Sequence, residues 1–249
     1  MDRMAYFKRT GFVSGRIPNK TATIDSGSPI LIVVTSVLVR KKCLFVDTKG
    51  YSDNGVTWTL DSFEIDGDTS QFNGPWDKLD DYIINQRFVA DDGKIYRIQA
   101  TVVDMALNTL YVCEYLKRYS YGVFGGKGKD HLPNGETYRF FHPDALDIIG
   151  TDKIFHINMG KLKNQIIAIE NSFWRIGIYQ PPWCPNFPED FRWEKDSRTI
   201  NAYAFNLAVL ELIAEYWCKE HLNLPSLDWQ AFWDAAKKGE FYTDNRPAA

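Results

Sequence analysis

Residues 30–40 read ILIVVTSVLVR, an almost unbroken run of apolar and β-branched residues. Such a run suits a strand buried on both faces of a sheet better than an edge strand, in which apolar and polar residues would alternate. Strands are expected next at 42–47 and 57–65, because Ser52-Asp53-Asn54-Gly55 between them is a hairpin signal. The sequence therefore predicts a three-stranded meander that starts from a central strand.

The segments after the meander alternate between helical and strand patterns. A helix is expected over 76–88, where Trp76, Leu79 and Ile83 share one face after the breaker Gly74-Pro75. The next expected elements are a strand at 95–103 that ends at Asp104, a helix at 108–119 and a short strand at 121–124. This β-β-β-α-β-α-β order is that of a ribonuclease-H-like α/β fold, with a mixed central sheet flanked by helices.

Three regions are expected along the chain. Residues 1–29 are polar and rich in Gly and Pro, which indicates an N-terminal arm. Residues 30–222 would form the ribonuclease-H-like domain, and residues 223–249 a C-terminal helical extension. The expected late helices lie at 151–173, with Thr151 as a candidate cap, at 197–221, which is apolar on more than one face, and at 226–238.

Composition excludes several classes of protein. The net charge of −3 provides no overall attraction to nucleic acid, so any DNA contact must be local. The four cysteines form no C-x-x-C pair, which argues against a zinc knuckle or a disulfide framework and favours a reduced, cytoplasmic protein. The longest apolar run, residues 29–39, is far shorter than the roughly 20 residues that cross a bilayer, and we expect no membrane association.

The glycine-rich stretch 122–135 has three interpretations. A phosphate loop would need a Ser or Thr directly after its lysine, but Gly128 follows Lys127 and the glycine-to-lysine spacing is one residue short. We therefore expect no ATPase site in this chain. The stretch is then a mobile surface loop, or a local contact to the DNA backbone through Lys127 and Lys129.

The carboxylates are the best candidates for chemistry. The four histidines show no metal-ligand spacing, and no Gly-x-Ser-x-Gly motif or placed cysteine nucleophile is present. Metal-assisted cleavage of a phosphodiester needs several acids that converge on ions about 4 Å apart. Asp104 stands at the end of a predicted strand, where α/β sheets carry their sites, although a strand-end Asp is also a common helix cap or turn former.

Six short motifs occur between residues 30 and 212. They are a strand, a Trp-x-hydrophobic-Asp hairpin, a strand ending in Asp, a glycine-rich segment, a helix opening and a closing aromatic- and alanine-rich helix, at 32–40, 56–61, 100–104, 123–128, 149–152 and 193–212. Together these motifs resemble the nuclease domain of the tailed-phage DNA-packaging terminase large subunit, in its lambda-type branch.

The resemblance implies a site of three metal-binding Asp residues that would hold Mg²⁺ or Mn²⁺. Carried over by position, these acids fall on Thr35, Asp104 and Asn201, so two of the three are replaced. A hydroxyl or amide oxygen is neutral and holds a hard cation only weakly. Asp196 is a possible replacement acid and a second catalytic candidate, and Asp47 and Asp61 lie in neighbouring strands, although all three also fit ordinary surface or turn acids.

Two functions follow from these expectations. The first is a metal-dependent endonuclease domain acting on double-stranded DNA during viral DNA packaging, with a site that is degenerate at Thr35 and Asn201. The family's packaging ATPase would then be a separate part, and the small terminase and portal protein are further expected partners. The second is a non-catalytic module that docks to DNA, to a packaging motor, or to a virion or host protein. Its surface could include the stripe of Trp229, Phe232 and Trp233, which equally suits a core.

Overall fold

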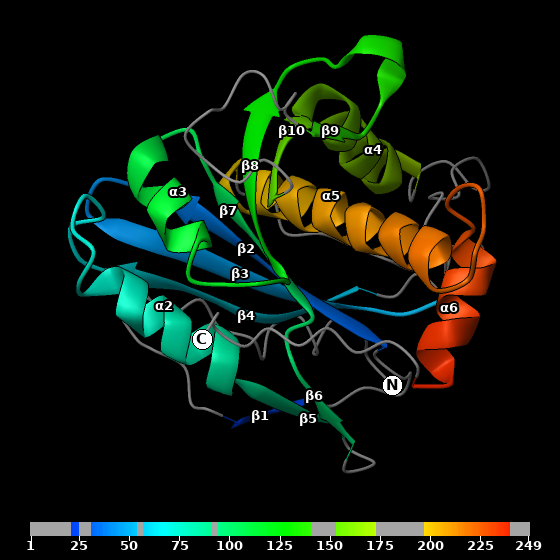
Figure 1. Ribbon diagram of the computed structural model, residues 1–249, viewed down its shortest axis with the longest axis horizontal. Coiled ribbons are helices and arrows are strands. Elements are labelled where there is room, and N and C mark those ends of the chain that lie inside the picture. The colour runs from blue at the N-terminus through cyan, green and yellow to red at the C-terminus, as the bar shows by residue number, and fades with distance from the viewer. Residues whose placement is uncertain are drawn as a thin grey trace.

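A computed structural model describes residues 21–24, 31–53, 57–90, 94–140, 153–172 and 197–239. These residues form a large mixed sheet, a small second sheet and helices that cover both faces of the large sheet (Figure 1). The mixed α/β class predicted from the sequence is confirmed.

The large sheet is built around the strand that was expected to be central. Its order is β4-β3-β2-β7-β8-β10-β9, and β2 is buried along its whole length. The predicted meander is confirmed, since β2, β3 and β4 pair antiparallel in sequence order. Strands β7, β8 and β10 run parallel to β2, whereas β9 is antiparallel. The strands are β2 (Ile32–Val39), β3 (Cys43–Tyr51), β4 (Thr57–Asp66), β7 (Ala100–Asp104), β8 (Val123–Lys129), β9 (Tyr138–Phe140) and β10 (Ile154–Asn158).

A small sheet adjoins the large one and changes two expectations. It joins β1 (Thr21–Ile24), β5 (Arg87–Ala90) and β6 (Ile95–Tyr96), so part of the expected arm is a strand. The single strand predicted at 95–103 is divided between β6 and β7, which belong to different sheets. Gln99, in the link, is tied to Val33 of β2, because its Oε1 accepts from Val33 N–H at 2.7 Å and its N–H donates to Val33 O at 2.8 Å.

Two apolar cores hold the helices to the sheet. Helices α2 (Pro75–Asn85) and α3 (Thr109–Leu116) cover the face that carries Val33, Val37 and Val103. Helices α4 (Met159–Ser172) and α5 (Ser197–Glu220) cover the opposite face, which carries Val34, Leu38 and Val102. The density of buried residues predicted for the last long helix is confirmed in α5. No helix in the described part of the chain is long and apolar enough to span a membrane.

The glycine-rich stretch was expected to be a loop from residue 125, and this was wrong for residues 125–129. They belong to strand β8. A Cβ at Gly125 would lie 2.5 Å from Met105 Sδ, and a Cβ at Gly126 would lie 3.0 Å from Phe205 Cε1. Glycine is therefore required here by close packing on both faces of a strand, not by a turn.

The expected helix at 151–173 was partly wrong as well. Residues 154–158 form strand β10, and helix α4 begins only at Met159. The side chain of Asn158 accepts a hydrogen bond from the backbone N–H of Lys161 at 3.0 Å, which caps the new helix. Thr151 lies outside the described residues.

The aromatic stripe near the C-terminus belongs to the core. Helix α6 (Trp229–Lys237) packs against α5, and the side chains of Phe232 and Trp233 are fully buried. Asp228 caps the helix by accepting from the N–H of Ala231 at 3.0 Å. Phe232 and Trp233 therefore offer no exposed surface to which a partner could dock, as the second function considered above would require.

Candidate functional site

Asp104 is the last residue of β7, and its surroundings are only partly polar. Its side chain is 9% exposed, and Oδ1 accepts a hydrogen bond from the N–H of Ala106 at 2.9 Å. Burial raises the pKa of the carboxyl above its ordinary value, while the Ala106 hydrogen bond and the charge of Arg40 lower it. The hydrogen bond from Ala106 is that of a turn in which the Asp side chain accepts from the backbone two residues later, a purely structural role for a strand-end Asp.

Asn201 lies on the same face of the sheet as Asp104. Asp104 pairs with Gly126 of β8, and a Cβ on Gly126 would meet Phe205 of α5. Because register partners point to the same face, Asp104 faces the α5 side. Asn201 precedes Phe205 by one helical turn, and its side chain is partly exposed. The structure therefore brings Asn201 to the end of α5 that is nearest to Asp104.

Thr35 is not brought together with these two residues. It pairs with Thr101, three positions before Asp104 in β7, and it shares the opposite face with Val33 and Val37. Its hydroxyl is fully buried, 2.8 Å from the hydroxyl of Thr48, which is 2.7 Å from the hydroxyl of Tyr82 in α2. Thr35 thus belongs to a chain of hydroxyl groups under α2.

Asp61 ends this chain of hydroxyl groups. The Tyr82 hydroxyl donates to Asp61 Oδ2 at 3.5 Å. Burial raises the pKa of Asp61 to about 7, against the opposing effects of the Ser62 backbone N–H and of Tyr82. Since Asp61 pairs with Thr48, it faces α2 and not the side of Asp104.

Asp47 faces α5, and its carboxylate forms a buried ion pair with Lys49. Its Oδ2 lies 3.2 Å from Lys49 Nζ, and the two side chains are 0% and 2% exposed. The amide of Asn206 donates to the same carboxylate at 3.0 Å. Burial raises the pKa of Asp47, and Lys49 is the main opposing influence. A carboxylate already neutralised by an ammonium group is poorly available to a metal ion.

The described residues do not supply the ligands of a two-metal centre. They contain no group of three or more His, Cys, Asp or Glu side chains placed to hold a metal ion. Around Asp104 the described donor set is one carboxylate and the neutral amide of Asn201, which does not fit a hard divalent cation. Asp196, the expected replacement acid, lies outside the described residues.

Lys127 and Lys129 lie on strand β8 and not on a loop. Lys127 pairs with His156 of β10, which pairs in turn with Arg139 of β9. These residues and Lys129 share one face of the sheet and form what we call the basic row. Burial and the charges of Lys129 and Lys127 lower the pKa of His156.

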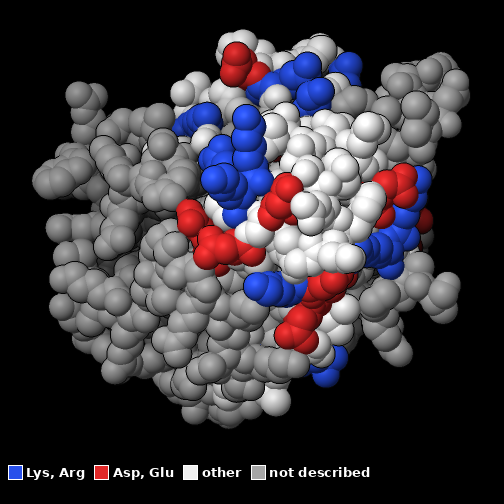
Figure 2. Space-filling view, turned by 90° about the vertical axis from the view of Figure 1, so that its left-hand side faces the viewer, with Lys and Arg blue, Asp and Glu red and all other residues white. Residues whose placement is uncertain are grey.

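The basic row is suited to a polyanion. Lys127, Lys129 and Arg139 place positive charge on this face, and the phosphates of a DNA backbone would be attracted to it. In Figure 2, Lys and Arg side chains are most frequent in the upper half of the described surface, the level at which β8 ends in Figure 1, and acidic side chains lie among and below them. Sequence reasoning missed His156 and Arg139, although the alternation Phe155, His156, Ile157 was a strand signal.

The comparisons with known proteins gave one match. A family model described as the terminase large subunit gpA, endonuclease domain, matches residues 10–206, which is most of the chain. No curated protein and no solved structure matched the chain.

Proposed function

Because the chain belongs to the family of terminase large subunit gpA endonuclease domains, we propose that it is a DNA-binding nuclease domain of viral DNA packaging whose cleavage centre is degenerate. One observation carries the proposal. The strand-end Asp104 shares its face with the amide Asn201, while Thr35 is held by Thr48 on the opposite face.

The ribonuclease-H-like fold is part of this proposal. The order β4-β3-β2-β7-β8, with an antiparallel meander followed by two parallel strands, supports it. We propose that residues 30–222 form this domain, with the chain before and after it as extensions. Strands β10 and β9 then extend the sheet beyond the basic pattern and carry half of the basic row.

Double-stranded DNA is the proposed ligand, and the basic row is its proposed contact surface. Lys127 and Lys129 would contact phosphates, as expected from the sequence, and the row adds His156 and Arg139. The proposal places the chain in the host cytoplasm. Its partners there would be a separate packaging ATPase, a small terminase or a portal protein.

The test is nicking of supercoiled plasmid in Mg²⁺ and in Mn²⁺ by the full chain and by Asp104→Asn. We expect no cleavage above the background of the variant, together with retained binding of a duplex. Asn201→Asp is the matched gain-of-function variant, because it adds a second carboxylate on the face of Asp104. Two nearby carboxylates bind a divalent cation far better than one, so metal binding measured by calorimetry should appear or rise in this variant.

An active nuclease with an altered set of ligands is the second candidate. It is favoured if the unaltered chain cleaves plasmid and Asp104→Asn does not. Asp196→Asn would then be the next variant, since Asp196 is the nearest acid in the sequence to Asn201. Loss of cleavage in that variant as well would overturn the proposal of a degenerate centre.

A further inference from the structure

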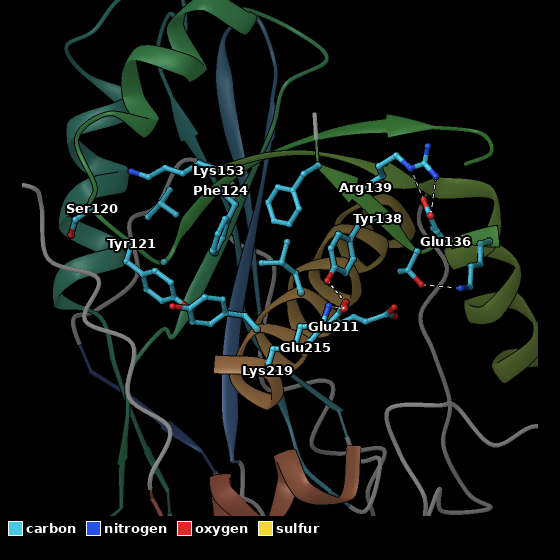
Figure 3. Close-up of a pocket in the computed structure, with 17 residues that line it drawn as sticks. Ser120, Tyr121, Phe124, Glu136, Tyr138, Arg139, Lys153, Glu211, Glu215 and Lys219 are labelled. Atoms are coloured by element: carbon cyan, nitrogen blue, oxygen red, sulfur yellow. Dashed lines mark hydrogen bonds and ion pairs between the residues drawn. The ribbon is translucent and has the colours of Figure 1, made fainter. Parts of the chain in front are cut away.

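A cavity of about 680 Å³ lies on the α5 side of the sheet, away from Asp104. It is bounded by the residues that lead into β8, by β9 and by the C-terminal half of α5 (Figure 3). This volume is within the range of about 300–1,000 Å³ typical of small-ligand sites. None of the residues proposed above for cleavage lines it.

Aromatic rings form most of its walls. Tyr121 lies with its ring centroid 5.7 Å from that of Tyr216 and 6.1 Å from that of Phe124. On the far side stands Tyr138 (Figure 3), and its ring centroid lies 6.0 Å from that of Phe140. Tyr216 is 43% exposed and Phe140 is 42% exposed. Several exposed large rings gathered at one hollow are unusual on a protein surface and indicate a binding site. The cavity therefore offers flat apolar surfaces to a ligand.

The polar groups stand at one side of the cavity, on α5. Glu215 accepts a short hydrogen bond from the Tyr138 hydroxyl and pairs with Lys219 at 2.5 Å. Burial raises the pKa of Glu211, against its hydrogen bond with Thr137 and the charge of Lys161. These carboxyls can accept hydrogen bonds from a ligand that carries amino groups.

Cationic groups stand at the rim. The ammonium of Lys153 donates to the carbonyls of Leu116 and Tyr119, and Arg139 is paired with Glu136 at 2.7 Å. Lys153 and Lys219 line the cavity, and Arg139, whose pairing partner His156 lies on the other face of the sheet, borders it on the edge strand β9 (Figure 3). Aromatic platforms bordered by cations are the general pattern of sites for single-stranded nucleic acid.

We propose that this cavity binds an unpaired nucleobase of a single-stranded DNA segment. The base stacks on Tyr121 and Tyr216, and its exocyclic amino group donates to Glu211 or Glu215. The adjoining phosphates lie near Lys153 and Lys219. This inference rests on the proposed function, because DNA is the ligand that the family membership implies. A wholly apolar ligand would displace water from the open sides of both carboxyls and offer them no hydrogen bond in return, which is costly.

Helix α5 passes both the position beside Asp104 and the cavity. Phe205 contacts the position of Gly126, the pairing partner of Asp104, and Glu211 and Glu215 follow six and ten residues later. At about 1.5 Å per residue, these carboxyls stand about 9 and 15 Å further along α5. With about 3.4 Å between nucleotides of a stacked strand, this separation corresponds to about three to four nucleotides. One strand could thus enter the cavity while its duplex lies at the C-terminal end of β7 and β8, where Asp104 and the basic row stand on opposite faces of the sheet.

The test is fluorescence anisotropy with labelled oligonucleotides of about 12 nucleotides, as oligo-dC, oligo-dA, oligo-dT and a duplex. Tyr216→Ala should weaken binding of oligo-dC about 5- to 100-fold, the loss expected for one stacking partner. Tyr216→Phe keeps the ring and should bind as the unaltered chain does. Leu110→Ala is the control for an exposed residue elsewhere, since Leu110 is 69% exposed on α3. Oligo-dC and oligo-dA should bind more tightly than oligo-dT, which has no exocyclic amino group.

The outcomes separate this inference from the proposed function. Unchanged binding of oligo-dC by Tyr216→Ala would overturn the cavity as a base site, and equal affinity for oligo-dT would overturn the role of the carboxyls. If the duplex still binds in either case, the proposed function stands without the cavity. If neither duplex nor single strand binds the unaltered chain, both proposals fail.

Discussion

Asp61 makes the stability of this protein depend on pH in a way that can be calculated. Its pKa of about 7 in the folded protein compares with an ordinary value of 3.8. A carboxyl whose pKa is raised by folding stabilises the protein fully below the pKa of the unfolded chain, and this contribution is lost as the pH rises through the folded pKa. The loss falls between about pH 4 and pH 7 and amounts to about 4 kcal/mol, or about 2 kcal/mol after allowance for partial exposure.

The perturbation is Asp61→Asn, which keeps the shape and can still accept a hydrogen bond from the Tyr82 hydroxyl. Asn does not titrate, so the variant should gain about 2–4 kcal/mol relative to the unaltered protein between about pH 4 and pH 8. The free energy of unfolding is measured with urea at both pH values by tryptophan fluorescence. Asp66→Asn, at an exposed carboxyl of the same strand, is the control and should show no such gain.

A constant difference between Asp61→Asn and the unaltered protein at all pH values would refute the reasoning. It would mean that the carboxyl is hydrated in the folded protein and that the environment under α2 is not apolar. Asp47 lies on the other face of the sheet, and its charge adds a smaller increase to the pKa of Asp61 than burial does. The gain in Asp61→Asn therefore reports mainly the removal of a buried charge.

Three further perturbations test other parts of the structure. Lys49→Met leaves the buried Asp47 carboxylate without its cation and should lower the free energy of unfolding by about 3–5 kcal/mol. Adding Asp47→Leu to the same chain should restore much of this loss. Both are measured by urea unfolding, and a loss below about 1 kcal/mol in Lys49→Met would contradict the buried ion pair. Lys127→Gln should weaken duplex binding and reduce the slope of log affinity against log salt by about 1, whereas an unchanged slope in an anisotropy titration would remove Lys127 from the DNA contact. Gly126→Ala should destabilise the protein by about 1–3 kcal/mol through overpacking against Ile157, Val102 and Phe205. Gly128→Ala meets only the flexible Met159 side chain and should cost less. Equal thermal stability of the two variants would show that the sheet yields at Gly126.

Local patterns predicted the frame of the fold well. The run at 30–40 became the fully buried β2 because its mostly apolar and β-branched residues can be buried on both faces of a central strand. The helices α2, α5 and α6 follow from apolar spacing and breakers, and their predicted bounds differ from the observed ones by three residues or fewer at each end. These elements are decided by residues close together in the sequence.

Elements decided by distant contacts were predicted poorly. Gly125 and Gly126 suggested a loop, but they are strand residues that admit Met105 on one face and Phe205 on the other. The alternation of β10 was hidden in a segment that also suits a helix, and residues 125–129 of its partner β8, which carry the pairing, had been expected to be a loop. The basic row could not be predicted for the same reason, because Lys127, His156 and Arg139 meet only through the register of three strands.

The candidate site shows how one strand register limits what a motif can imply. Thr35 of β2 pairs with Thr101, which lies three residues before Asp104 in β7. Because side chains alternate along a strand, an odd separation places Thr35 on the face opposite to Asp104. A carboxylate in place of Thr35 would be buried beside Thr48 and Tyr82, near Asp61. Two buried carboxyls linked through the same hydroxyl groups would repel each other, so one would stay protonated. The neutral threonine therefore stabilises this face of the sheet, and Asn201 becomes the position at which an added acid could meet Asp104.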